Sequence, residues 1–324
     1  MSRKSFLKGA TAALALGASV GPVLIGTRRS CAATHKPEAN ALNVKEIAPG
    51  IFVHQGVHAI YTPQNAGDIS NASFIIGQDA VAVIDTGGTY LVGMALKRAI
   101  RKQTDRPIRY VINTHMHPDH VFGNAAFKSE ETIFVAHHKM ARGLAARAKR
   151  YLAINRQNAG EEAFKGTQIV LPQKGIKSRE TLNLGDRELV LDPQKTAHTD
   201  NDLVITDTRT KTLFLGDLLF SKHCPALDGS ILGWLQVIDK LSKVPGARVV
   251  PGHGPAAMDW PDALKPERHY LQTITDEVRT LIAKGETLGD AMKIAAQAEK
   301  KNWVLFEEFH KRNVAAAFAE LEWE

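Results

Sequence analysis

Residues 115–120 read HMHPDH, a run with three imidazoles and one carboxylate in six positions. Imidazole nitrogens and carboxylate oxygens are the ligands that zinc and harder divalent ions prefer. In an extended segment, side chains two positions apart share a face, so His115 and His117 can point toward one ion. Asp119 and His120 follow a proline, where the chain must turn, and they can serve a second ion. The hexapeptide therefore predicts a loop that holds two neighbouring metals.

Three further candidate ligands, His198, Asp217 and His253, lie beside apolar runs at Gly- or Thr-rich breaks. Each is weak by itself, because an Asp after a strand is more often a turn residue. The count supports them as a set, since two metals with about four ligands each need roughly seven protein groups if one group bridges. The chain offers seven such groups, which are His115, His117, Asp119, His120, His198, Asp217 and His253.

The order of these residues resembles that in the metallo-β-lactamase superfamily. An HxHxDH motif, a single His, a single Asp and a final GHG follow one another along residues 51–255. The resemblance implies an α/β fold, a four-layer αββα sandwich with the metals at one edge. It assigns one metal to His115, His117 and His198 and the other to Asp119, His120 and His253, with Asp217 as the bridge.

Two positions refine this resemblance. The segment VIDTGG at residues 83–88 matches a family signature whose Asp, here Asp85, supports the metal loop without binding the metal. Asp217 stands where the best-known zinc β-lactamases have Cys or no bridging ligand, and where glyoxalase II and lactonases have Asp. The resemblance therefore implies a metal site like that of glyoxalase II, and it does not favour β-lactamase activity.

Two longer segments show a narrower resemblance. The first joins LGDLLF at residues 215–220 to HCPALDGS at residues 223–230, and the second runs from FHKRNV at 309–314 to ELEWE at 320–324. Both resemble the quinoprotein relay system zinc metallohydrolases, a group of exported proteins. This implies a functional link to a quinoprotein or sulfur-oxidation system.

The ligand set predicts hydrolysis. Two zinc ions, or iron or manganese in their place, would share a bridging water and lower its pKa toward neutrality, so that hydroxide is available. Asp119 would orient that hydroxide and accept its proton. Four residues shortly after the bridging Asp are expected to line the substrate cleft: Phe220, His223, Leu227 and Trp234. Their aromatic and apolar groups suit a small ester, thioester, lactone or lactam.

Two other functions stay open. A persulfide dioxygenase uses the same scaffold and most of these ligands but oxidises its substrate with a single iron. A metal-binding accessory protein of a quinoprotein or sulfur-oxidation system would bind metal without turnover. Two zinc ions per chain favour the hydrolase, one iron with oxygen uptake favours the dioxygenase, and metal without activity favours the accessory role.

Three segments are expected: an export signal at residues 1–41, a metallo-β-lactamase-fold domain at 42–260 and a helical extension at 261–324. Apolar runs predict strands near 51–55, 73–76, 80–85, 109–113, 132–136, 181–184, 188–191, 203–206, 213–215 and 248–250. Helices are predicted near 91–102, 139–158 and 230–242. In the extension, apolar residues recur at helical spacing, with Gly285 ending one helix and Thr287 capping the next. These helices would cover the sandwich, wall the cleft or form a dimer contact, so the oligomeric state is left open.

The net charge of +7 comes mostly from the first 41 residues, which hold six Lys and Arg and one Glu. Without them the charge falls to +2, which argues against nucleic-acid binding and leaves a small molecule as the expected partner. Of the two cysteines, Cys31 also lies in this segment, so Cys224 would have no partner for a disulfide. We expect Cys224 to be a small buried apolar residue.

The first residues predict export to the periplasm. Arg3, Lys4 and Lys8 precede an apolar stretch at 9–25, and a small-residue cleavage site follows at 39–41, with another possible site after Ala33. The basic pair resembles a twin-arginine signal with Lys in the second place. The apolar stretch is short for a permanent membrane span. N-terminal sequencing of the natively expressed protein should find a mature chain that begins near Leu42, and an intact Met1 in a soluble cytoplasmic fraction would contradict export.

Overall fold

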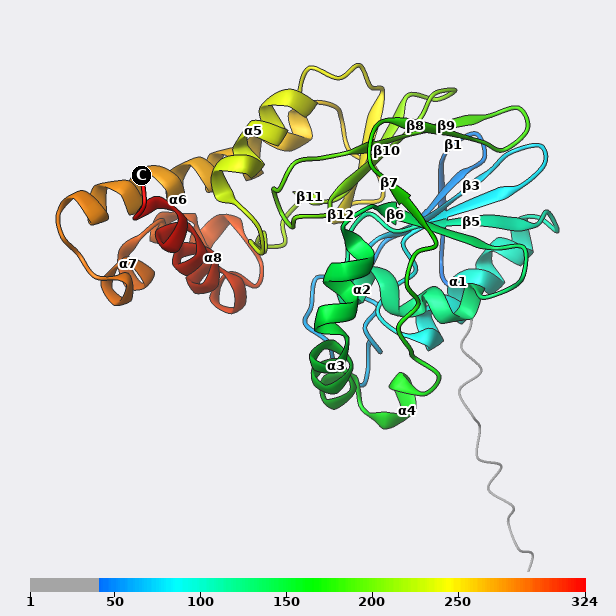
Figure 1. Ribbon diagram of the computed structural model, residues 1–324, viewed down its shortest axis with the longest axis horizontal. Helices are drawn as coiled ribbons and strands as arrows, with labels where there is room; N and C mark the ends of the chain where they lie inside the picture. Colours follow the sequence, from blue (N-terminus) through cyan, green and yellow to red (C-terminus); the bar gives the residue numbers. More distant parts are fainter. Residues whose placement is uncertain (1–40) are drawn as a thin grey trace, which may run out of the picture. The chain divides into compact units, whose positions relative to one another are not determined.

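Strands rich in Val, Ile and Leu pair into two sheets in the computed structural model, which describes residues 41–324 (Figure 1). The first sheet has seven strands in their chain order: β1 (Lys45–Ala48), β2 (Ile51–His54), β3 (Ala72–Ile76), β4 (Val81–Ile84), β5 (Ile108–Ile112), β6 (Ile133–His137) and β7 (Lys174–Ile176). Strands β1 to β4 pair antiparallel, and β4 to β7 pair parallel. Parallel neighbours need crossover connections, and helices supply them here.

The second sheet has five strands in the spatial order β12-β11-β10-β9-β8. They are β8 (Glu180–Asn183), β9 (Glu188–Pro193), β10 (Leu203–Asp207), β11 (Thr212–Phe220) and β12 (Arg248–His253). Only β11 and β12 pair parallel, and the helix α5 (Ile231–Leu241) connects them. Every residue of β11 is buried, as expected for a strand that is covered on both faces.

Helices form the outer layers. Those that connect strands of the first sheet are α1 (Tyr90–Gln103), α2 (Pro118–Val121), η1 (Phe122–Phe127), α3 (Met140–Ala159) and α4 (Glu161–Phe164). Those that follow the last strand are η2 (Asp262–Leu264), α6 (Lys265–Ala283), α7 (Leu288–Ile294), η3 (Gln297–Asn302) and α8 (Phe306–Leu321). Thr287 caps α7 with its side chain, as predicted.

Four apolar cores hold the layers together, one of them around α2, η1 and α3. Ile84 and Phe214 belong to the core between the two sheets. Leu96 of α1 packs on the outer face of the first sheet. Trp234 of α5 and Ile274 of α6 belong to a third core, which joins β11 to the C-terminal helices. The predicted four-layer αββα sandwich with a C-terminal helical extension is therefore confirmed, while the predicted boundary between residues 260 and 261 stays a prediction.

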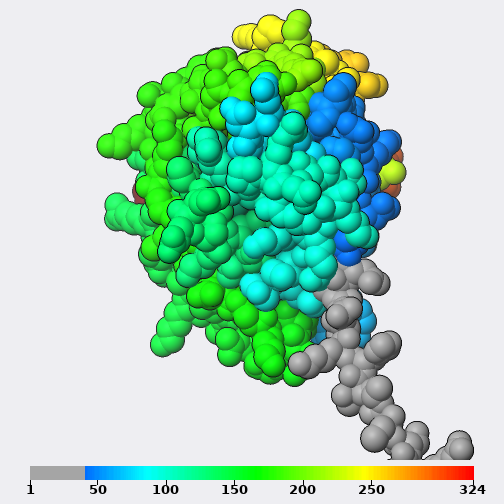
Figure 2. Space-filling view, turned by 90° about the vertical axis from the view of Figure 1, so that its right-hand side faces the viewer, coloured from blue at the N-terminus to red at the C-terminus, as the bar shows by residue number. Residues whose placement is uncertain are grey.

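The C-terminal helices lie at the end of the sandwich away from β1, β3 and β5 (Figure 1). Figure 2 looks onto the right-hand side of Figure 1, where the blue, cyan and green parts of the chain form most of the surface and the red last helix barely appears. None of the helices in residues 41–324 is both long and apolar enough to cross a membrane. The predicted export signal lies, except for its last residue, outside the described residues.

Two expectations about strand ends are wrong. Asp217 does not follow its strand but lies inside β11, which continues to Phe220. The strand pairing shifts around Gly216, whose φ of +52° suits only glycine without strain. His253 is the last residue of β12 and does not lie beyond it. The short strands β1 and β7 have no counterpart among the predicted ones.

A buried ion pair ties the two sheets together. Arg187 lies in the turn between β8 and β9 of the second sheet, and Asp207 is the last residue of β10. Their Nε and Oδ1 atoms are 2.9 Å apart with both side chains fully buried. The same guanidinium donates to the carbonyl oxygens of Ile76, at 3.1 Å, and Pro49, at 2.6 Å. Ile76 is the last residue of β3 in the first sheet, and Pro49 lies in the turn between β1 and β2. One side chain thus satisfies groups from both layers.

We predict that Arg187→Met lowers the free energy of unfolding by about 3–5 kcal/mol, because the carboxylate of Asp207 stays buried without its partner. Denaturant unfolding measures the change. Arg209→Met is the matched control, because the exposed Arg209 pairs with Asp186 on the surface and should leave the unfolding midpoint nearly unchanged. Equal effects of the two substitutions would show that Arg187 does not hold the sheets together.

Candidate metal centre

The seven predicted ligands meet at one edge of the sandwich. The HMHPDH segment leaves β5 and runs into α2, His198 lies in the loop between β9 and β10, and Asp217 and His253 belong to β11 and β12. They form two groups, in each of which one ligand atom per residue lies within 4.8 Å of the others. The groups are His115, His117, His198 and Asp217, and Asp119, His120 and His253. This is the division that the resemblance implied.

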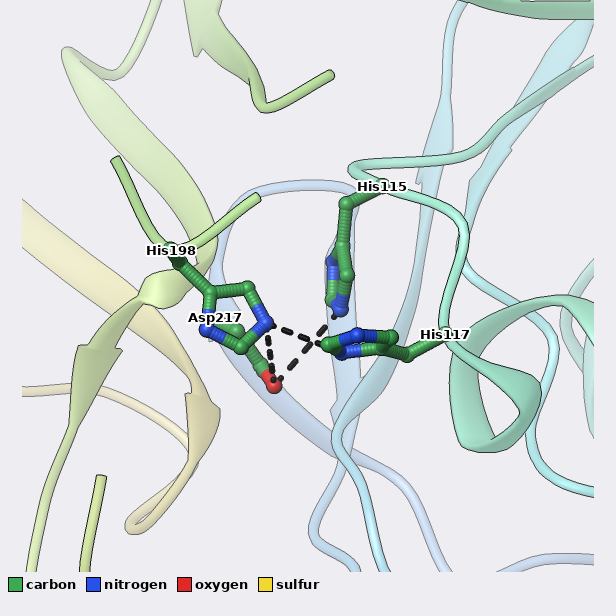
Figure 3. Close-up of side chains that lie close together, drawn as sticks. All are labelled: His115, His117, His198 and Asp217. Atoms are coloured by element: carbon green, nitrogen blue, oxygen red, sulfur yellow. Dashed lines mark hydrogen bonds and ion pairs between the residues drawn. The ribbon is translucent and has the colours of Figure 1, made fainter. Parts of the chain in front are cut away.

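In the first group, three imidazoles surround the carboxylate of Asp217 (Figure 3). Its Oδ2 lies 3.6 Å from Nε2 of His115 and 3.5 Å from Nε2 of His198. Nε2 of His198 lies 2.9 Å from Nδ1 of His117. All of these residues except His117 are buried, so the donor atoms converge in a region that excludes water.

The hydrogen bonds of the two facing imidazoles leave lone pairs pointing at each other. His198 donates through Nδ1 to the carbonyl oxygen of Ala226 at 2.6 Å, and His117 donates through Nε2 to Oδ2 of Asp228 at 3.0 Å. Burial, together with the neighbouring His117, lowers the pKa of His198 to about 3, which keeps it neutral. Two lone pairs at 2.9 Å cannot hydrogen-bond to each other, but both can bind one cation.

The second group is arranged around Asp119. Its Oδ2 lies 3.4 Å from Nε2 of His120 and 3.2 Å from Nε2 of His253. Asp217 reaches this group too, with Oδ1 at 3.1 Å from Nε2 of His120. Burial lowers the pKa of His253, but the carboxylates of Asp217 and Asp119 raise it to about 9. The cluster of buried carboxylates therefore favours positive charge at this place.

Buried polar atoms without a partner test whether metals fit. Within residues 41–324, Nε2 of His115, Nε2 of His120 and Oδ1 of Asp217 are buried and make no hydrogen bond. Such atoms cost free energy unless something binds them. Because all three point into the two groups and are nitrogen or oxygen donors, the residues present fit a pair of zinc ions.

Asp85 fixes the loop from outside the ligand set, as expected. It follows β4 and accepts hydrogen bonds from the backbone nitrogen of Thr114, at 2.9 Å, and from Nδ1 of His120, at 2.8 Å. It also accepts from Oγ1 of Thr114 at 2.7 Å, so this hydroxyl in turn accepts from Nδ1 of His115 at 3.0 Å. Asp85 therefore orients one ligand directly and a second through Thr114.

The sequence analysis missed Asp228 and its partner. Oδ2 of Asp228 accepts from His117 and pairs with Arg147 of α3, whose Nη1 also donates to Oη of Tyr151 at 3.1 Å. Burial opposes ionisation of Asp228, but hydrogen bonds from His117 and Arg147 hold its pKa well below the ordinary value. Asp228 thus orients His117 through a hydrogen bond to its second ring nitrogen, as Asp85 orients His120.

Asn313 of α8 holds the loop that carries Asp228. Its Oδ1 accepts from the backbone nitrogen of Leu227 at 2.9 Å, and its Nδ2 donates to the carbonyl oxygen of Pro225 at 2.6 Å. Between these two residues lies Ala226, whose carbonyl orients His198. The last helix therefore supports two ligand histidines through this loop.

A cavity of about 670 Å³ lies over the two groups. Phe220, His223 and Leu227 line it, as predicted. Trp234 does not, so this prediction is wrong: its side chain is fully buried, and its ring packs behind His198 at a centroid distance of 5.3 Å. The cavity is also lined by Phe309 and Arg312 of α8 and by one face of α3, so the last helix forms part of its wall.

We predict that the purified protein binds two zinc ions per chain and that Asp228→Asn weakens only one of them. The amide still accepts a hydrogen bond but loses the charge, and such outer partners typically change metal affinity by about 10- to 100-fold. Competition with a chromophoric chelator measures both affinities. Asp239→Asn on the surface of α5 is the control. A single zinc ion, or two ions that both ignore Asp228→Asn, would refute this assignment.

The comparisons with known proteins agree with this geometry. The family model of the metallo-beta-lactamase superfamily matches residues 65–253. A linear primary-alkylsulfatase from Pseudomonas sp. (strain ATCC 19151) is 36% identical over 55 residues, which are 17% of this chain and 10% of that protein.

Two solved structures illustrate the likeness of the fold. The stereoselective inverting sec-alkylsulfatase Pisa1 from Pseudomonas sp. is 17% identical with a TM-score of 0.66, over 86% of this chain and 50% of that one. A metallo-beta-lactamase from Pontibacter korlensis is 21% identical with a TM-score of 0.56, over 71% and 99%. The chain thus spans about half the length of the matched sec-alkylsulfatase and a tenth of the primary-alkylsulfatase. Because the family model covers more than half of its residues, the chain belongs to the metallo-β-lactamase superfamily.

Proposed function

We propose that this protein is a dinuclear zinc hydrolase that acts on a small ester, thioester, lactone or lactam. It belongs to a superfamily of metal-dependent hydrolases. The observation that carries the proposal is the set of seven donors in two adjacent groups, with buried nitrogen and oxygen atoms that lack any other partner. Asp217, which contacts both groups, favours two ions over one.

The residues of the site would have separate roles in hydrolysis. Two zinc ions, when bound, would activate a water molecule at neutral pH and polarise the bond to be cleaved. Asp119 lines the cavity, and its side chain is 14% exposed, so it can orient an attacking water and accept its proton. The hydroxyl of Ser70 donates to the backbone oxygen of Asp119 at 2.6 Å and fixes it in place. Phe220 and Leu227 exclude water on one side of the cavity.

A sulfate ester is a second candidate substrate, which the sequence analysis did not consider. Two observations favour it: the local identity with a primary-alkylsulfatase, and a structural match that extends over 86% of this chain for the sec-alkylsulfatase against 71% for the β-lactamase. Release of sulfate from an alkyl sulfate, compared with turnover of carboxylic esters, thioesters and lactams, decides between the two.

We propose further that the protein works in the periplasm alongside a quinoprotein system. The basic and apolar start of the sequence and the two segments near residues 215–230 and 309–324 support this. The iron dioxygenase and the accessory protein are the competing proposals. One iron per chain with oxygen uptake would establish the first, and bound metal without turnover of any ester, thioester or lactam would establish the second.

We predict that Asp119→Asn and Asp85→Asn fail in different ways. Asp119→Asn keeps an oxygen but loses the proton acceptor, so turnover should fall by about a hundred- to ten-thousand-fold, whatever the zinc concentration. Asp85→Asn should weaken zinc binding about 10- to 100-fold, and added zinc should restore turnover. Steady-state rates on a chromogenic ester, measured across a zinc titration, separate the two. Rescue of Asp119→Asn by zinc, without rescue of Asp85→Asn, would reverse the two assignments.

A further inference from the structure

We propose that the cavity selects a substrate with an apolar body and an anionic group, and that Arg150 of α3 and Arg312 of α8 bind this group. The proposal deepens the hydrolase function and rests on it. The metal centre alone indicates the reaction, which is hydrolysis. The arginines add the class of substrate, which is a molecule with an apolar body and a negatively charged oxygen-containing group.

Three arginines line the cavity, and only one of them is already engaged. Arg147 pairs with Asp228 and donates to Tyr151. Within residues 41–324, neither Arg150 nor Arg312 forms an ion pair or a side-chain hydrogen bond, although both line the same cavity. Guanidinium groups bind carboxylates and sulfates through parallel hydrogen bonds, and these two are free to do so.

The lining has no carboxylate left to neutralise these two charges. Its acidic residues are Asp119, Asp217 and Asp228. The first two face the histidines of the metal groups, and Asp228 is held by Arg147 and His117. Bound metals would add further positive charge. A cleft with an excess of one sign concentrates ligands of the opposite sign, so this cavity favours anions.

The same walls are apolar next to the arginines. On α3, Arg150 and Ile154 are four residues apart and share the helix face that lines the cavity. Ile154 is 43% exposed, and Ile60 on another part of the wall is 51% exposed. Phe309 stands three residues before Arg312 on α8 and lines the cavity as well. Each helix therefore offers one large apolar side chain beside one free guanidinium.

The test compares two esters that differ by one charge: the mono-para-nitrophenyl ester of suberic acid and para-nitrophenyl octanoate. We expect the zinc-loaded wild type to prefer the anionic ester at low salt, with the preference falling as salt is added. Arg150→Ala and Arg312→Ala should each lower kcat/KM for the anionic ester about two- to fivefold through KM, and the double variant about tenfold. The neutral ester should lose less, because it lacks the charge that the guanidinium groups bind.

Two controls keep the result specific. Arg142→Ala removes an exposed arginine of α3 that does not line the cavity, and it should change neither ester. Arg150→Lys with Arg312→Lys keeps the charge and should restore part of the preference. Equal kcat/KM for both esters, with no response to the double variant, would overturn the proposal and leave the hydrolase function standing.

Measurements of ligand binding test the anion site even if the proposed hydrolase function is wrong. If neither ester is hydrolysed, and no thioester, lactone, lactam or sulfate ester is either, the hydrolase assignment fails, and calorimetry with the anilide of suberic acid and with octananilide still tests the anion site. Tighter binding of the anionic anilide, lost in the double variant, supports it, and equal binding of both overturns it. Hexyl sulfate and hexanoate, tested as competitors, identify the preferred oxyanion, and competition by neither counts against the proposal.

Discussion

The carboxylate of Asp217 lies within 3.6 Å of imidazole nitrogens from both metal groups, inside a strand that is buried along its whole length. A buried charge is tolerated only with close partners of opposite charge or with bound cations. The local backbone is shaped around it. A Cβ on Gly252 would lie 1.9 Å from Oδ1 of Asp217, so β12 can pass this carboxylate only as glycine. Gly216, next to Asp217, has a positive φ at the point where the pairing of β11 with β12 shifts.

Each ligand histidine is also fixed through its second ring nitrogen. The partners are a carboxylate for His120 and His117, a hydroxyl for His115, and backbone carbonyls for His198 and His253. These partners come from loops in both halves of the chain, and Asp228 and Ala226 come from the same loop. The imidazoles are therefore oriented by the protein before any ion binds, and this preorganisation strengthens metal binding and sets the positions of the donor atoms.

The sequence predicts those features whose residues lie close together in the chain. Three histidines and one Asp in a hexapeptide reveal the metal loop, and continuous apolar runs reveal most strands. The missed features depend on partners far apart in the chain. Asp228 is 111 positions from His117, and Asn313 is 86 from Leu227, so neither stands out from ordinary loop and helix residues. Trp234 was misplaced for the converse reason, because proximity to Asp217 in the chain does not bring it to the cavity.

The contact between Asn313 and the loop at residues 225–227 also couples the ligand histidines to the packing of α8. The loop carries the partners of His117 and His198, so their orientation depends on α8 being in place. Loosening of α8 would leave all seven donors in the chain but would release two of the histidines from their orienting partners. Metal affinity would then report how well α8 is packed, because metal binding and folding stabilise each other.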